Sequence, residues 1–164
     1  MFRLISHLKF LFSATNQHGV HSPFVYNYVT KCLYKKDTLK LPVILKVLVK
    51  SICYFNYNTI LLLENYKSSE ENIIQHCPNV SIVKNNADLV IGNVSDLQSS
   101  HLKVNELSNN CMLLLDGIHE KPLNNKSWEL IKELEHVRVT IDLFYCGVIF
   151  FRKEQVKEHF KIRI

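Results

Sequence analysis

The chain has 164 residues, of which 47% are hydrophobic and 21% are charged. This length and composition predict one folded domain with a sizeable core and exclude an intrinsically disordered chain. The net charge is +5, but the 20 Lys and Arg residues are scattered singly or in pairs such as Lys35–Lys36. Nucleic-acid binders concentrate their basic residues in a stripe that also carries aromatic side chains. We therefore expect no nucleic-acid partner.

Cysteine usage indicates the redox setting. The five cysteines form no Cys-x-x-Cys pair, and their odd number argues against a disulfide framework: Cys32, Cys53, Cys77, Cys111 and Cys146. Most lie in apolar segments, where a free thiol behaves as a small hydrophobic group. We expect a reducing, cytoplasmic setting.

The first segment, "MFRLISHLKFLFSAT", is basic and apolar, as a signal peptide would be. Lys9 interrupts the apolar run, however, and no small-residue cleavage site follows it. We predict a helix over residues 2–12 that packs on the core. An amphipathic helix on a membrane surface is the alternative.

Two further helices are predicted before residue 56. Ser22 is a suitable N-cap with Pro23 at the first helical position, and apolar side chains recur at helical spacing as far as Leu33. Residues 41–55 are apolar almost all round, which indicates a buried helix. Its two lysines, at positions 46 and 50, make this segment too short and too charged to span a bilayer. No transmembrane segment is expected.

From residue 57 the pattern changes to apolar runs of strand length, which is typical of strands covered on both faces. The predicted central strands, all parallel, are 59–64, 88–92 and 111–116. Helical patterns separate them, and the predicted helices are 68–77, 95–108 and 124–137. Ser68 and Glu71 fit a capping box at the start of the first.

This alternation predicts an α/β fold, a Rossmann-like three-layer sandwich with a mostly parallel sheet. Residues 137–144 and 147–152 are predicted to close it as an antiparallel strand pair at one side. We expect a single domain over 1–164, with an N-terminal helical region (1–56) and an α/β core (57–164).

One connection does not fit a simple parallel sheet. "NVSIV" (79–83) is joined to "ADLVIGN" (87–93) by very few residues, whereas adjacent parallel strands need a crossover of about a dozen. Four residues span at most about 14 Å, so we predict no parallel ladder between 80–83 and 89–91. Either the two segments form an antiparallel hairpin, with the Asn85–Asn86 pair tolerating positive φ, or the first lies outside the main sheet.

Polar side chains follow the three central strands, where open α/β sheets gather their functional groups. We expect five of them to converge on one edge of the sheet: Glu64, Asn65, Asn93, Asp116 and His119. His18 and His21 lie in a loop that could fold over this edge. Asp116 and His119 are candidates for a general acid–base pair, since His titrates near neutral pH. The alternative is that Asp116 caps the turn and His119 packs on it.

The two ends of the chain resemble a known family. "MLLLDGIHEKPLNNKSWELI" (112–131) and "VTIDLFYCGVIFFRKEQVKEHFKIR" (139–163) resemble the C-terminal half of short bacterial class I S-adenosylmethionine-dependent methyltransferases. That family reads Asp-Asp-Ile-His-Trp at the strand end, followed by a helix with Trp and by Ile-Asp-Leu-Phe and Gly-Leu-Val-Phe-Phe strands. "HGVHSPFVYNYVTKCL" (18–33) is similar to its N-terminal region. The resemblance implies a seven-stranded Rossmann-like fold whose last strand is antiparallel.

The cofactor half departs from this pattern. Cofactor binding in the fold uses glycines after the first strand, whereas "LLLENYKSSEEN" (61–72) has none, and Lys84 stands where the family has an acidic residue. Glu64, Asn65 and Asn93 remain as candidates for contact with S-adenosylmethionine, whose binding we expect to be weak or absent. A related arrangement holds a divalent metal with an Asp at the fourth strand and Asp-Asn at the fifth. Gly92 and Gly117 stand where two of these ligands would be, which leaves Asp116 alone, so we expect no metal.

We therefore favour a methyltransferase-like domain that has weakened or lost its cofactor binding and serves as a binding or structural module. Its partner would be an unknown small molecule or protein. The alternatives are an active small S-adenosylmethionine-dependent methyltransferase with an atypical cofactor loop, and a truncated remnant without a selected role.

Overall fold

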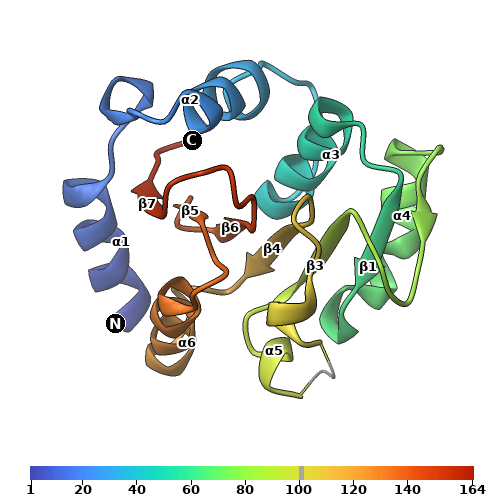
Figure 1. Cartoon of the computed structure of the whole chain (residues 1–164). Coiled ribbons are helices and arrows are strands. Elements are labelled where there is room, and N and C mark those ends of the chain that lie inside the picture. Colours follow the sequence, from blue (N-terminus) through green and yellow to red (C-terminus); the bar gives the residue numbers. More distant parts are fainter. Residues whose placement is uncertain (100–101) are drawn as a thin grey trace.

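The structure is a computed structural model that describes residues 1–99 and 102–164. The described residues form a seven-stranded sheet in the order β2-β1-β3-β4-β6-β5-β7 (Figure 1). Every ladder is parallel except the two that β6 makes with β4 and β5. The predicted α/β class with a mostly parallel sheet is confirmed. The strands are β1 (Thr59–Leu62), β2 (Ser81–Ile82), β3 (Leu89–Asn93), β4 (Met112–Asp116), β5 (Val139–Asp142), β6 (Cys146–Phe150) and β7 (Glu158–Lys161).

Helices surround this sheet. They are α1 (Phe2–Ser13), α2 (Pro23–Tyr28), α3 (Val43–Phe55), α4 (Glu70–His76), α5 (Asp96–Ser99) and α6 (Pro122–Glu133), with a π-helical turn at Val29–Leu33 and 3₁₀ helices at Gln17–Gly19, Glu64–Ser69 and Val104–Glu106. The predicted start of α2 is confirmed, since the backbone N–H of Val25 donates to Ser22 Oγ. None of the helices in the described residues has the length and apolarity that a bilayer crossing requires.

The hydrophobic core lies on both faces of the sheet. On one face α2, α3 and α4 pack against the strands, and on the other face α6 and α5 do so (Figure 1). Alternate side chains of β4 serve the two faces: Leu114 belongs to the first cluster, and Leu113 and Leu115 to the second. Because both faces are buried, β4 needs apolar residues at every position, which explains the continuous apolar run.

Neither alternative considered for residues 79–83 is right. β2 lies in the main sheet, parallel to β1, and β1 separates it from β3. Ile82 and Leu89 are both level with Ile60, so the chain leaves β2 at the height where β3 begins and only has to cross β1. The segment 83–88 can reach about 20 Å, and two strand spacings are about 10 Å. The predicted lack of a ladder between 80–83 and 89–91 is confirmed.

The crossover between β2 and β3 does use the tolerance of asparagine for a left-handed backbone. Asn86 has φ 51°, a conformation that Asn adopts more readily than most residues. It serves a crossover here, and not the hairpin that the sequence allowed.

The C-terminal strand pair is confirmed, with Val139 opposite Phe150 and Asp142 opposite Gly147. β6 inserts between β4 and β5. β7, which the sequence did not predict, lies outside β5 and parallel to it. The last strand is therefore parallel, and not antiparallel as the resemblance implied; the reversed strand is β6. The chain before α2 extends this edge, because Thr15 forms a parallel bridge with Ile162.

Two predicted helix features are wrong. Ser68 and Glu71 form no capping box, because the chain enters α4 from the preceding 3₁₀ helix and the N–H of Glu70 bonds to the carbonyl of Lys67. The segment 95–108 contains α5 and a separate 3₁₀ turn, while 100–101 lie outside the described residues. Several of its side chains pack on the same core cluster, namely Leu97, Leu102, Val104 and Leu107. At about 100° per residue, one continuous helix would keep Leu97, Val104 and Leu107 on one face but point Leu102 away from it.

The helix predicted over 2–12 is present as α1, but its packing differs from the prediction. Within α1 only Phe10 is buried, in a small separate cluster with Ala14 and Phe144. Most of its other apolar side chains face outward.

Candidate functional site

The carboxyl ends of β1, β3 and β4 lie at one edge of the sheet, as predicted. Asn93 and Asp116 are the last residues of neighbouring strands and stand in register. Asp96, at the start of α5, joins the strand ends: it accepts a hydrogen bond from Asn65 Nδ2 at 2.5 Å and another from the backbone N–H of Asn93 at 2.9 Å. Three of the five predicted residues therefore gather here.

Tyr66 also belongs to this group, through a hydrogen bond to Asp116. It follows β1 in the 3₁₀ helix Glu64–Ser69, is only 9% exposed, and its hydroxyl donates to Asp116 Oδ2 at 2.5 Å. Burial, and then the hydrogen bond to Asp116, raise the pKa of Tyr66 far above its usual range, so the phenol keeps its proton. Sequence reasoning missed Tyr66. The only signal was an aromatic residue in the position where a cofactor loop has small residues.

Glu64 does not join this network. Its side chain is 77% exposed and forms an ion pair with Lys67 at 2.6 Å, three residues further along the chain. An exposed pair of this kind contributes little to stability. The structure therefore places Glu64 as a solvated residue beside the group formed by Asn65, Tyr66 and Asp116.

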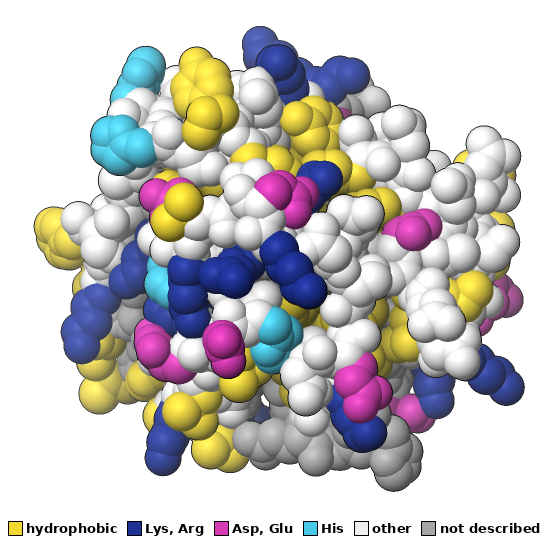
Figure 2. Space-filling model, viewed as in Figure 1, with side chains coloured by type: hydrophobic (Ala, Val, Ile, Leu, Met, Phe, Trp, Pro, Cys, Tyr) yellow, Lys and Arg dark blue, Asp and Glu magenta, His cyan; other side chains and the backbone are white. Residues whose placement is uncertain are grey.

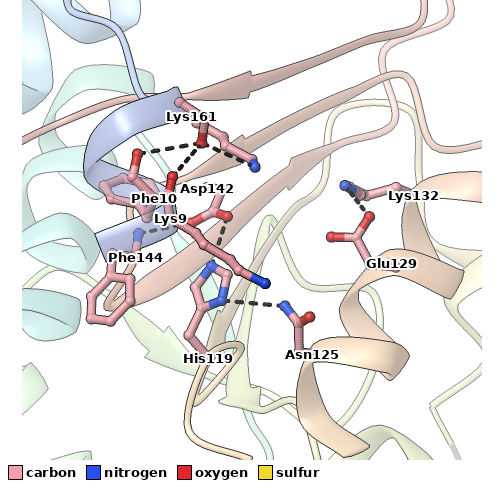
Figure 3. Close-up of polar contacts among 10 residues, drawn as sticks. Lys9, Phe10, His119, Asn125, Glu129, Lys132, Asp142, Phe144 and Lys161 are labelled. Carbon is pink, nitrogen blue, oxygen red and sulfur yellow. Dashed lines mark hydrogen bonds and ion pairs between the residues drawn. The ribbon is translucent and has the colours of Figure 1, made fainter. Parts of the chain in front are cut away.

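His119 binds partners other than Asp116. Its Nε2 lies 2.8 Å from Asp142 Oδ2, and its Nδ1 lies 3.2 Å from the Nδ2 of Asn125 (Figure 3). Because the Asn125 amide nitrogen can only donate, Nδ1 accepts and Nε2–H donates to Asp142. The ring stacks on Phe144 at 5.1 Å and meets the edge of Phe10 at 6.3 Å. Both ring nitrogens are thus engaged in a largely buried position.

The hypothesis of an Asp116–His119 acid–base pair is not supported by this geometry, since each side chain bonds elsewhere. Asp116 Oδ1 accepts the backbone N–H of Gly117 at 2.7 Å, as a cap of the turn would. That agrees with the alternative interpretation of Asp116. His119 is packed as that alternative requires, but against aromatic rings of α1 and of the β5–β6 turn.

Asp142 is the second residue that sequence reasoning missed. It ends β5 and is 3% exposed. Its Oδ1 accepts the backbone N–H of Phe144 at 2.8 Å, and Phe144 has φ 66°, which is unusual for a bulky residue. Asp142 therefore holds a strained turn and orients His119 at the same time. A carboxylate at the end of an apolar strand was the available signal.

Cys146 lies between Asp116 and Asp142. It pairs with Asp116 across the sheet and follows the turn that begins at Asp142. It is fully buried. Burial, and then the charges of Asp116 and Asp142, raise the pKa of this thiol well above its usual value. A thiol that keeps its proton is a poor nucleophile, so Cys146 is not placed as an activated one. All five cysteines are free.

The loop that carries His18 and His21 does not belong to the group at the ends of β1, β3 and β4. It connects α1 to α2 at the upper left of Figure 1 and is tied to the β7 side of the sheet by the Thr15–Ile162 bridge. Among the described residues, no three His, Cys, Asp or Glu side chains are placed to share a metal ion.

Two cavities lie beside the sheet and beside α3. One of about 360 Å³ opens between the crossover 84–87 and residues 102–107, over Leu61, Leu63 and Val90 on the α6 face of the sheet, and so reaches the carboxyl end of β1. Another of about 420 Å³ lies between α3 and residues 31–39. Neither is lined by Asp116 or His119.

Comparison of the chain with protein-family models, with curated proteins and with solved structures found no significant match.

Proposed function

We propose that the chain is a methyltransferase-like domain of Rossmann-like architecture whose cofactor crevice is closed, and that it serves as a binding or structural module. The observation that carries this proposal is Tyr66, buried in the 3₁₀ helix that follows the first strand and bonded to Asp116. A seven-stranded sheet with one reversed strand near its C-terminal end supports the lineage.

The glycines at the strand ends accommodate neighbouring side chains. A Cβ at Gly92 would lie 2.5 Å from Leu63 Cδ1, and one at Gly117 would lie 2.6 Å from the amide of Asn93. Protein side chains therefore take the space at these two glycines, and the segment 61–72 after β1 offers no glycine at which a cofactor could approach the backbone.

The polar groups at this edge also satisfy one another. Asn65 and Asp96 are paired, and Asp116 accepts from Tyr66 and from the backbone. A ligand would have to break such bonds, each worth about 1–3 kcal/mol when buried. Two lost contacts would weaken cofactor affinity by about two to four orders of magnitude.

Isothermal titration of the purified chain with S-adenosylmethionine and S-adenosylhomocysteine tests the proposal. We expect no binding in the micromolar range. Micromolar binding would overturn the proposal and favour an active small methyltransferase with an atypical loop. In that case Asp116→Asn should abolish binding if the ligand sits at the strand ends, whereas Glu120→Gln, a change at an exposed neighbour, should not.

A further inference from the structure

The apolar face of α1 points away from the protein. Its large side chains are strongly exposed, including Phe12 at 91%, Leu4 at 65% and Leu8 at 49%. With Ile5 and Leu11 they fall within an arc of about 120° when each residue turns the helix by about 100°. Helices that pack on a core bury this kind of face, and a contiguous exposed apolar patch marks an interaction surface.

The first 36 residues carry the excess positive charge of the chain, and two of their basic residues lie on α1. Residues 1–36 contain no Asp or Glu, and their five basic residues are Arg3, Lys9, Lys31, Lys35 and Lys36. The remaining 15 Lys and Arg residues are balanced by 15 Asp and Glu residues, so the first 36 residues account for the whole net charge of +5. Arg3 and Lys9 are exposed and belong to α1 itself. Figure 2 shows hydrophobic side chains with Lys or Arg among them at the left margin, over α1.

We propose that α1 binds an anionic lipid surface. The helix would lie in the plane of the membrane, with Phe12 and the leucines at the boundary between headgroups and acyl chains. Arg3 and Lys9 would extend toward lipid phosphates. Twelve residues give a helix of about 18 Å, which is shorter than the ~30 Å hydrocarbon core and suits this orientation.

The charge distribution favours a lipid surface over a second copy of the chain. Two copies joined face to face through α1 would place Arg3 and Lys9 of one copy near those of the other. Residues 1–36 supply no carboxylate to pair with them, and like charges across an interface oppose association. An anionic membrane offers both an apolar layer and the opposite charge.

Co-sedimentation with vesicles tests this proposal. The full chain should bind vesicles of phosphatidylcholine mixed with phosphatidylglycerol at least about tenfold more tightly than pure phosphatidylcholine, and salt should weaken that difference. The double change Leu8→Ser with Phe12→Ser should weaken binding at least about tenfold, because both side chains lose their burial in lipid. Arg3→Gln with Lys9→Gln should reduce binding only to the mixed vesicles.

Leu130→Ser is the matched control, because Leu130 is 60% exposed on α6, outside α1. It should leave vesicle binding unchanged, and circular dichroism should show that every variant is folded. The proposal is overturned if the native chain does not sediment with the mixed vesicles, or if Leu130→Ser weakens binding as much as the α1 changes. Self-association that the Phe12 variant abolishes, measured by analytical ultracentrifugation, would identify the face as a protein interface instead.

Discussion

Replacing Tyr66 by Phe tests whether the edge of the sheet is closed from within. The change removes one hydroxyl group, which is 2.5 Å from Asp116 Oδ2, and leaves the buried ring in place. A hydrogen bond to a charged group contributes about 1.5–3 kcal/mol. Asp116 keeps the backbone N–H of Gly117, so we expect the lower part of that range, about 1.5–2 kcal/mol. For a chain of this length that corresponds to a fall in Tm of about 3–8 °C.

Urea unfolding at neutral pH measures the loss. Tyr34→Phe is the matched control, since its hydroxyl donates to the carbonyl of Arg163 at an exposed position and should cost less than about 1 kcal/mol. Combining Tyr66→Phe with Asp116→Asn in a double-mutant cycle isolates the pair. Equal urea midpoints for native and Tyr66→Phe proteins, with unchanged m values, would refute the reasoning.

Three other changes test the packing, the titration and the thiols. Gly147→Ala should cost about 1–3 kcal/mol in urea unfolding, because the new Cβ would lie 2.5 Å from the fully buried ring of Trp128; an unchanged midpoint would contradict this packing. Burial, and then two nearby lysines, lower the pKa of His159 below 6.5, so the unfolded chain holds the proton more tightly. The contribution of His159 to the free energy of unfolding is therefore complete above about pH 6.5 and is lost as pH falls toward the lower pKa of the folded state. His159→Gln should flatten that decline. An equal decline in the native and variant proteins would exclude His159 as its source. Iodoacetamide at mildly alkaline pH should label the exposed Cys53 first, because burial raises the pKa of Cys32 and of Cys111 to about 12; mass spectrometry follows the labelling. Cys53→Ser should remove the fast reaction. A fast reaction that persists in this variant would show that a buried thiol is accessible.

The central strands could be predicted because burial on both faces leaves a direct signature in the sequence. In β4, Leu114 packs under one layer of helices and Leu113 under the other, so no polar position interrupts the run. The start of α2 was equally legible, since Ser22 and Pro23 act locally through the hydrogen bond to Val25. These features depend on few distant residues.

The edge strands lacked such a signature. β2 has only two residues, and β7 alternates between half-buried and exposed positions. Their places are set by backbone pairing with β1 and β5, which no local pattern encodes. The position of β2 also depended on where β2 ends relative to the start of β3 along the strand direction. A short connection cannot join two full-length parallel neighbours, but it can join two parallel strands when one stops at the level where the other begins.

In the candidate site, too, some contacts could be predicted from the sequence and others could not. That Asn93 and Asp116 meet follows from parallel strands ending in register. The partner of His119 could not be read from the sequence, because Asp142 comes from β5, and β6 inserts between β4 and β5. Sequence proximity favoured Asp116, three residues away, whereas the tertiary structure supplied a carboxylate from another strand.

The hydrogen bonds at the strand ends also bear on whether the chain is a decaying remnant. A cofactor site that simply lost its ligand contacts would keep polar groups that water or a ligand once satisfied, and each buried orphan costs about 1–3 kcal/mol. Within the described residues, the buried side-chain atoms without a partner are Trp128 Nε1, His136 Nε2 and Arg138 Nε. None belongs to the strand-end group, where Asp116 bonds to Tyr66 and Asn65 bonds to Asp96. A strand edge whose polar groups find partners within the protein needs no cofactor for its stability, as the proposed binding or structural module requires.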